Sequence, residues 1–113
     1  MAISWINLTE TNHVDAAIEN SNEKTIVFFK HSTRCIVSRH ALLQLEKEWN
    51  FNNDTIDFYL LDLLNHRNVS NYISDATGVY HQSPQIVVIQ NKAVIYTASH
   101  EGINAMNLHQ KLN

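Results

Sequence analysis

Two apolar runs joined by a helical segment constrain the fold of this chain more than any other feature. Residues 25–29, Thr-Ile-Val-Phe-Phe, are β-branched or aromatic, too few for a helix, and predict a strand buried on both faces. Residues 56–61 predict a second buried strand, and residues 36–49 carry apolar side chains at helical spacing between the two. This order predicts a β-α-β unit, in which the two strands are parallel and the crossover is right-handed.

The remaining predicted elements extend this unit into a four-stranded mixed sheet. They are a first helix around residues 14–18, a short helix at 69–76, a third strand at 85–90, a fourth strand at 93–98 and a last helix that Asn104 caps. Only Asn91 and Lys92 separate the third strand from the fourth, so these two strands must be antiparallel. We expect an α/β fold in which helices flank the sheet and the strands lie in the order second, first, third, fourth.

Local sequence also predicts helix boundaries and helix faces. Ser32 or Thr33 can cap the helix at 36–49, and Gly78 lies just past the helix at 69–76, as a C-terminal stop should. The expected apolar face of the 36–49 helix comprises Ile36, Leu42, Leu43, Leu45 and Trp49. The expected apolar side of the last helix comprises Ala105, Met106, Leu108 and Leu112. Four aromatic side chains are expected in the core: Trp5, Trp49, Phe51 and Tyr59.

Composition and charge exclude several classes of function. The net charge is −3 with neutral histidines, and no block of basic residues occurs, so we expect no binding to nucleic acid or to membranes. No apolar run approaches the ~18–20 residues that span a bilayer, and the N-terminal residues lack the features of a signal peptide. A single cysteine cannot form an internal disulfide, which fits a reducing compartment. The sequence predicts a single cytoplasmic domain, residues 1–113.

The only cysteine, Cys35, lies where the first predicted strand gives way to a helix. A thiol at a helix N-terminus faces unpaired backbone N–H groups and the positive end of the helix dipole, and both favour the reactive thiolate. Four basic side chains are close in sequence and could add to this effect: His31, Arg34, Arg39 and His40. The alternative is a small apolar side chain packed in the core. Position alone leaves both readings open.

The order of elements, with a cysteine after the first strand and a proline before the third, resembles the thioredoxin fold. Ser83-Pro84 holds the only proline of the chain, at the place where thioredoxin-fold proteins carry a cis proline against the active-site cysteine. The resemblance therefore implies a cis peptide bond before Pro84. It also implies that Pro84 lies in van der Waals contact with the sulfur of Cys35.

Several motifs in the same order and spacing resemble the monothiol bacilliredoxins, which are YtxJ-like proteins associated with the small thiol bacillithiol. These motifs are Lys30-His31-Ser32 with Cys35 and Ser38, Val69-Ser70-Asn71, Gly78-Val79 with His81 and Ser83-Pro84-Gln85, and Ala98-Ser99-His100. One residue departs from the usual Thr-Cys-Pro-Ile-Ser pattern, because Ile36 stands where the family commonly has proline. A proline there would preorganise the first helical turn, and Ile36 restores a backbone N–H.

The resemblance implies a thiol-disulfide oxidoreductase with Cys35 and Ser38 as its catalytic residues. A thioredoxin resolves its mixed disulfide with a second cysteine three residues on, where this chain has Ser38. Its hydroxyl can hydrogen-bond a thiolate but cannot displace a disulfide. Cys35 would therefore take a small thiol from a protein mixed disulfide and wait for another thiol to regenerate it. The implied partners are bacillithiol or a similar low-molecular-weight thiol and S-thiolated proteins, and no cofactor is expected.

Seven further residues are candidates for substrate binding. They are His31, Ser32, Arg34, Ser83, Pro84, Gln85 and His100. Arg34 could pair with the carboxylates of a bacillithiol-type ligand, which carries malate on a glucosamine thiol. The segment from Ser83 precedes a strand whose backbone pairs with substrate main chain in thioredoxin-like proteins, and His100 could line the same groove or simply close its loop.

No metal site is expected, although the chain has seven histidines. They are scattered, and no pair has the spacing of a zinc site. Asp57 and Asp62 flank the second predicted strand and are expected to form an ion pair or to cap. A second function from another class stays open. In that reading the chain is a non-catalytic or stress-related binding module, Cys35 is a sensor or inert, and the groove beside Pro84 holds a peptide.

Overall fold

The computed structural model describes residues 2–112. Its elements, in chain order, are β1 (Trp5–Asn7), α1 (Thr11–Asn20), β2 (Thr25–His31), α2 (Ile36–Glu48), β3 (Ile56–Asp62), α3 (Arg67–Thr77), β4 (Gln85–Gln90), β5 (Ala93–Ser99), the 3₁₀ helix η1 (His100–Gly102) and α4 (Ala105–Lys111). The predicted helices and strands are all present, with ends that differ by a few residues. Within residues 2–112 no helix is long and apolar enough to cross a membrane.

The five strands form one mixed sheet in the order β1-β3-β2-β4-β5. β2 is parallel to β3 and antiparallel to β4, and β4 is antiparallel to β5. The predicted order of the four longer strands is therefore confirmed, but the prediction of four strands was one short. The missing strand, β1, has three residues and pairs in parallel with the outer edge of β3. So short a strand has no detectable alternation, and its pairing with β3 is a long-range contact that the local sequence does not encode.

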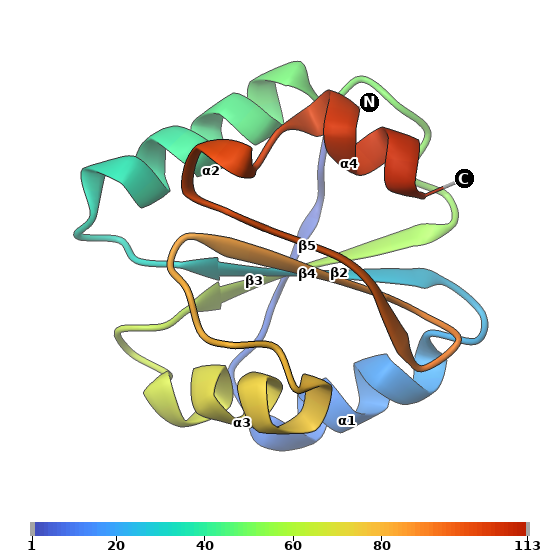
Figure 1. The fold of residues 1–113 in the computed structure, drawn as a ribbon. Helices are drawn as coiled ribbons and strands as arrows, with labels where there is room; N and C mark the ends of the chain where they lie inside the picture. Colours follow the sequence, from blue (N-terminus) through green and yellow to red (C-terminus); the bar gives the residue numbers. More distant parts are fainter. Residues whose placement is uncertain (1, 113) are drawn as a thin grey trace.

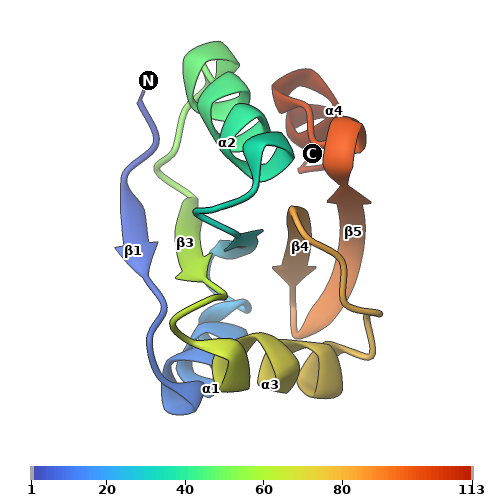
Figure 2. The ribbon, with the colours of Figure 1, turned by 90° about the vertical axis from the view of Figure 1, so that its left-hand side faces the viewer.

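Helices cover both faces of the sheet, as the buried β2 pattern predicts. Figure 1 shows α2 and α4 on one face and α1 and α3 on the other, and Figure 2 shows the same layers from the side. Two clusters of buried apolar residues fill the two interlayer spaces. Successive residues of β2 alternate between them, because side chains of a strand point to opposite faces: Phe29 belongs to the α2 layer and Phe28 to the α3 layer.

Several helix ends match the local signals. Gly78 ends α3 with a left-handed φ of 71°, a conformation that glycine adopts without a steric penalty. Asn104 caps α4, and its side chain accepts a hydrogen bond of 3.0 Å from the backbone N–H of Asn107. The predicted cap of α2 is wrong, because Cys35 occupies the N-cap position and no side chain caps this helix.

The predicted apolar faces of α2 and α4 are partly wrong. Ile36 is 75% exposed, Leu43 is 65% exposed and Met106 is 55% exposed. The inner face of α2 consists instead of Ser38, Ala41 and Leu45, whose spacing of three and four residues follows the helical period. Small side chains at two of these positions allow α2 to lie close to the sheet, so its bulkier side chains face solvent.

The four aromatic residues expected in the core pack there to different degrees. Trp49 is buried and contacts Phe51 and Phe58 edge to face, at ring centroid distances of 5.0 and 5.3 Å. Trp5, Phe51 and Tyr59 are half-buried and pack against the two core clusters.

Candidate functional site

One edge of the sheet gathers most of the predicted site residues. β2 and β3 are parallel, so their carboxyl ends meet at this edge, and β4 begins there because it runs antiparallel to β2. The turn that carries Cys35 follows β2, and Pro84 immediately precedes β4. The register pairs Lys30 with Gln85, which places Pro84 beside the end of β2.

Cys35 is half-buried and forms the N-cap of α2 with an extended backbone. Its backbone N–H donates to the carbonyl of Ser32 at 3.2 Å, and its carbonyl accepts from the N–H of Arg39 at 3.0 Å. An N-cap side chain normally accepts a hydrogen bond from an N–H of the first helical turn. Within residues 2–112 no other side chain serves this purpose at α2, so a Cys35 thiolate would lie where these N–H groups need an acceptor.

Ser38 is fully buried and is held by two hydrogen bonds from residues that precede Cys35. Its Oγ lies 2.7 Å from Nδ1 of His31 and accepts from the backbone N–H of Ser32 at 3.0 Å. The hydroxyl has a single proton to donate. When Nδ1 of His31 lacks a proton, Ser38 donates to the ring. When Nδ1 carries one, the ring donates to Ser38, and the hydroxyl proton is then free for another acceptor.

Burial lowers the pKa of His31, which is only 7% exposed. The carboxylates of Asp62 and Glu46 oppose this effect, and the guanidinium of Arg39 adds to it. Sequence reasoning placed His31 among substrate-binding residues. The structure places its ring inside the protein, against Ser38 and edge to face with Phe29 at a centroid distance of 6.1 Å.

The segment before β4 has the predicted backbone geometry. The Ser83-Pro84 peptide bond is cis, which confirms the expectation taken from the thioredoxin fold. The carbonyl of Pro84 accepts a hydrogen bond of 3.0 Å from the N–H of His100, whose φ is 53° and whose side chain is exposed. The Oγ of Ser83 is buried without a hydrogen-bond partner within the part of the chain that the structure describes. Contact between Pro84 and the sulfur of Cys35 stays a prediction.

The side chains of Gln85 and Arg34 take no part in the hydrogen bonds around Ser38. The buried Gln85 side chain donates to the carbonyl of Tyr80 at 2.9 Å and accepts from the N–H of Gln82 at 3.4 Å, so it fastens the segment that leads to Pro84. Arg34 is exposed beside Cys35. The structure therefore brings His31, Ser32, Cys35 and Ser38 together, while Gln85 serves the loop on the other face.

Sequence reasoning gave no role to Lys30, which the structure buries completely. Its ammonium donates to the carbonyl of Ser70 at 3.1 Å, to Oγ of Ser74 at 2.9 Å and to Nδ1 of His81 at 3.3 Å. Burial lowers the pKa of Lys30 to about 8. A charged residue directly after the apolar run of β2 was the available signal, since a lysine at a buried strand position needs partners.

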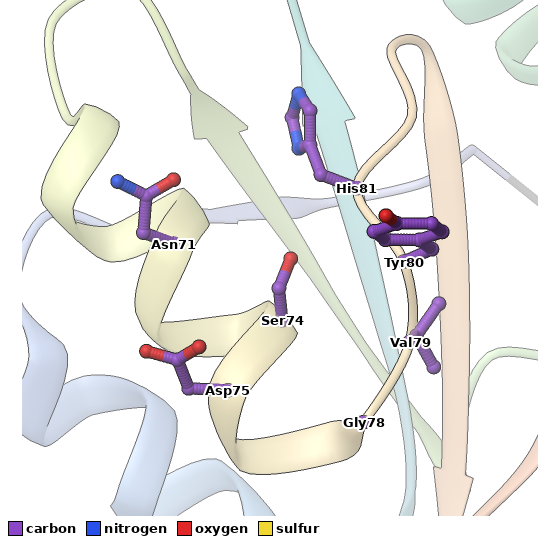
Figure 3. Close-up of a pocket in the computed structure, with 7 residues that line it drawn as sticks. All are labelled: Asn71, Ser74, Asp75, Gly78, Val79, Tyr80 and His81. Carbon is purple, nitrogen blue, oxygen red and sulfur yellow. The ribbon is translucent and has the colours of Figure 1, made fainter.

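Two of these partners of Lys30, Ser74 and His81, line a cavity of about 680 Å³ between α3 and the segment that follows it. Figure 3 shows Asn71, Ser74 and Asp75 on the helix, with Val79, Tyr80 and His81 on the segment opposite. The cavity lies on the α3 face of the sheet, whereas the bond between His31 and Ser38 lies on the α2 face.

Of the two aspartates near the ends of β3, Asp57 forms the predicted ion pair, whereas Asp62 closes a turn and neither pairs with a cation nor caps a helix within the described residues. Asp57 pairs with Lys24 at 3.4 Å. Asp62 accepts from the backbone N–H of Leu64 at 3.2 Å and from the side chain of Asn65 at 2.8 Å. Within residues 2–112 no group of three or more His, Cys, Asp or Glu side chains could hold a metal ion.

Comparisons with known proteins agree with this geometry. The family described as "Monothiol bacilliredoxin BrxC" matches residues 6–108. A solved structure of a candidate oxidoreductase with a thioredoxin fold has 30% sequence identity and a TM-score of 0.83, over 96% of this chain and 94% of that chain.

Two thioredoxin structures are more distant in sequence. The thioredoxin of Trypanosoma brucei brucei matches with a TM-score of 0.72 and 18% identity, over 99% of this chain and 90% of that chain. The thioredoxin of Fasciola hepatica matches with a TM-score of 0.69 and 17% identity, over 94% of each chain. The expected thioredoxin-like α/β fold is confirmed.

Proposed function

Because this chain belongs to the monothiol bacilliredoxin family of thiol oxidoreductases, we propose that Cys35 removes bacillithiol-type thiols from mixed disulfides on proteins. The observation that carries the proposal is the position of Cys35. The half-buried Cys35 is the N-cap of α2, and no other side chain in the described part of the chain accepts a hydrogen bond from the first turn of that helix. A negative sulfur at this position gains hydrogen bonds and a favourable interaction with the helix dipole.

The proposed reaction is a thiol-disulfide exchange in two steps. In the first step the Cys35 thiolate attacks the sulfur of the small thiol in a protein mixed disulfide. A disulfide forms between Cys35 and the small thiol, and the client cysteine leaves as a thiolate that takes a proton from water. In the second step another small thiolate attacks the adduct, which releases a small-thiol disulfide and restores the Cys35 thiolate. Electrons balance, because each step breaks one disulfide and forms another.

Ser38 assists this cycle but cannot regenerate the Cys35 thiolate. A hydroxyl does not displace a disulfide, and the chain has no second cysteine, so regeneration needs a thiol from outside. We propose that the Ser38 proton becomes available to the Cys35 thiolate when His31 donates to Ser38. The 2.7 Å distance from His31 Nδ1 to Ser38 Oγ and the bond from the N–H of Ser32 support this assignment, since Ser38 then accepts twice and donates once.

The remaining candidate residues are proposed to hold the substrate around this thiol. The Ser83-Pro84 segment, which the backbone bond between Pro84 and His100 fastens, would face the main chain of the client protein. The exposed Arg34 would pair with carboxylates of the small thiol. Gln85 would act indirectly, because its side chain fastens the loop in front of Pro84.

The test is the intact mass of the protein after it has been mixed with a client protein that carries bacillithiol on one cysteine. We expect the folded chain to gain the mass of one bacillithiol while the client loses the same mass. A client that carries glutathione is the matched probe, and slower transfer from it would support a bacillithiol-type substrate. At pH 7, iodoacetamide should label Cys35 of the folded protein faster than it labels a free cysteine.

The unfolded protein is the control, because its thiol is accessible whatever the fold does. An adduct on the unfolded chain without one on the folded chain would show that Cys35 is buried or unreactive in the native state. That result would refute the proposed activity and favour the binding-module reading.

A further inference from the structure

Three basic side chains converge on the face of the sheet that the proposed thiol chemistry does not use. Lys30 does not itself line the cavity beside α3, but its buried ammonium donates to Ser74 and His81, which do. The charge of Lys30 and that of Arg67, the first residue of α3, both lower the pKa of His81, after the larger effect of burial. The charge of Arg67 thus acts on His81, although Arg67 does not line the cavity.

These cations have no anionic partner within residues 2–112. The ion pairs in that part of the chain all involve other side chains. Lys30 satisfies its three N–H groups with neutral acceptors, so its hydrogen bonds are complete while its charge is uncompensated. A fully buried charge without a counter-ion is costly, and an anion in the adjoining cavity would lower that cost.

The tautomer of His81 provides a donor for such an anion. An ammonium has no lone pair, so the 3.3 Å contact between Lys30 Nζ and His81 Nδ1 requires that Nδ1 be the acceptor. The ring proton of neutral His81 is then on Nε2. The side chain is exposed and lines the cavity, so Nε2–H is available to a ligand and is polarised by the charge behind it.

The other lining residues narrow the chemistry of the ligand. Val79 and the 91% exposed ring of Tyr80 offer an apolar wall, which favours a ligand with an organic body over an inorganic ion. Asp75 is the only carboxylate that lines this cavity, and it disfavours ligands with more than one negative charge.

We propose that this cavity is a binding site for an organic monocarboxylate, which accepts a hydrogen bond from His81 and which the positive charges of Lys30 and Arg67 attract. The ligand's apolar part would pack on Tyr80. This site is independent of the proposed redox function, because Lys30 and His31 are consecutive in β2 and point to opposite faces of the sheet.

The charged and titratable groups around His81 determine how ligand binding would change the pKa of His81. They are Lys30 from β2, Arg67 and Asp75 from α3, and Tyr80 from the following segment. A bound carboxylate adds a negative charge beside a ring whose pKa burial and two cations lower, so binding should raise the pKa of His81.

The experiment titrates ¹⁵N-labelled Cys35→Ser protein with sodium benzoate at constant ionic strength and follows the imidazole nitrogens of His81 by NMR. This variant removes the thiol, and serine is a favoured N-cap residue, so the fold is retained. We expect a saturable shift at His81 and a higher His81 pKa in benzoate than in chloride. Acetate should bind more weakly than benzoate, because it lacks the ring.

Variants sharpen the test. Arg67→Gln should weaken benzoate binding about fivefold, because it removes one of the two positive charges that attract the ligand. Asp75→Asn should tighten it. Lys111→Gln is the matched control, since it removes the same charge from α4 on the opposite face of the sheet, and binding should not change.

The proposal is overturned if His81 shows no saturable shift, or if Arg67→Gln and Lys111→Gln reduce binding equally. Tighter binding of inorganic phosphate than of benzoate would also overturn it, because the ligand class would then be wrong. None of these outcomes bears on thiol transfer by Cys35, which is absent from the protein used.

Discussion

Lys30 and His31 are consecutive, both are buried, and they face different parts of the molecule. His31 lies in the α2 layer and bonds to Ser38, three residues after Cys35 along the helix. Lys30 lies in the α3 layer and bonds to the carbonyl of Ser70 and to Ser74 and His81, which line a cavity. The alternation of side chains along one strand thus separates a thiol site from a cationic site by a single residue.

The two side chains also differ in how they meet the cost of burial. Burial lowers the pKa of both. A histidine with a lowered pKa is neutral near pH 7. In its hydrogen bond with Ser38, either the ring or the hydroxyl can be the donor. Lys30 has a pKa of about 8 and stays mostly charged at pH 7 among three fixed acceptors. On the α2 face the proton between His31 and Ser38 can therefore change position, whereas on the α3 face Lys30 keeps its positive charge.

The largest expected effect comes from substitutions in the thiol site on the α2 face, which leave the α3 face unchanged. Cys35→Ser should abolish transfer of the small thiol, because no other thiol exists in the chain. Ser38→Cys should retain transfer and then release the adduct unaided, as an internal disulfide forms and the protein mass falls by two protons. Intact mass after mixing with the thiolated client measures both outcomes. Persistent adduct formation in Cys35→Ser, or a stable adduct on Ser38→Cys, would contradict the monothiol mechanism.

The second expected effect concerns the fixed charge on the α3 face. Lys30 has a pKa of about 8 in the folded state and 10.5 as its ordinary value, so the unfolded state binds the proton more tightly. Wild-type stability should therefore rise as the pH increases from about 8 to 10.5. Lys30→Met removes this cost and should raise the free energy of unfolding at pH 7 by up to about 3 kcal/mol.

Urea unfolding at pH 7 and pH 10 checks this prediction. The free energy of unfolding of wild type should be higher at pH 10 than at pH 7. For Lys30→Met the difference between the two pH values should be much smaller. Lys24→Met is the control, because Lys24 is exposed and its pair with Asp57 contributes little. A loss of stability in Lys30→Met at pH 7 would show that the three hydrogen bonds outweigh the cost of the buried charge.

A smaller effect is expected from Ser38→Ala. The substitution leaves the N–H of Ser32 and Nδ1 of His31 without their partner, and should cost about 2 kcal/mol of stability. Thiol transfer should slow without stopping. Ser74→Ala is the matched change on the other face, where it removes one of three acceptors of Lys30 and should not slow transfer. Equal transfer rates in wild type and Ser38→Ala would show that Ser38 has no part in the reaction.

The smallest expected effect is the pH dependence of stability from two imidazoles with lowered pKa values, those of His31 and His81. His31 and His81 both have lowered pKa values when folded, so the unfolded state binds more protons below their ordinary value of 6.5. Stability should fall as the pH drops through that value. His31→Gln and His81→Gln should each make the fall less steep. Urea midpoints between pH 5 and pH 8 measure the slopes, and unchanged slopes in both variants would exclude these residues as the cause.

Local sequence predicts the parts of the fold that depend on neighbours along the chain. The apolar run of β2, the glycine after α3 and the cap of α4 all have short-range causes. The strand β1 and the exposed side of α2 depend on distances between elements, which periodicity does not provide. Small residues at Ser38 and Ala41 decide which side of α2 is buried, although larger residues such as Leu43 suggest another.

The candidate site divides in the same way. The thiol at the start of a helix was visible in the sequence, and the cis peptide bond followed from the resemblance to the thioredoxin fold. The bond between His31 and Ser38 spans seven residues and needs the turn around Cys35 to be built first. The contact between Lys30 and His81 spans 51 residues and depends on how α3 packs on the sheet.

The outward position of Ile36 has a consequence for how this protein can evolve. Ile36 is the first residue of α2 and is 75% exposed, so it contributes little to the core. The first helical position tolerates proline, because its N–H has no partner within the helix. Exchange between isoleucine and proline here adjusts the surroundings of the neighbouring thiol at little cost to folding. The reactivity of the Cys35 thiol can therefore change during evolution without a change in the stability of the fold.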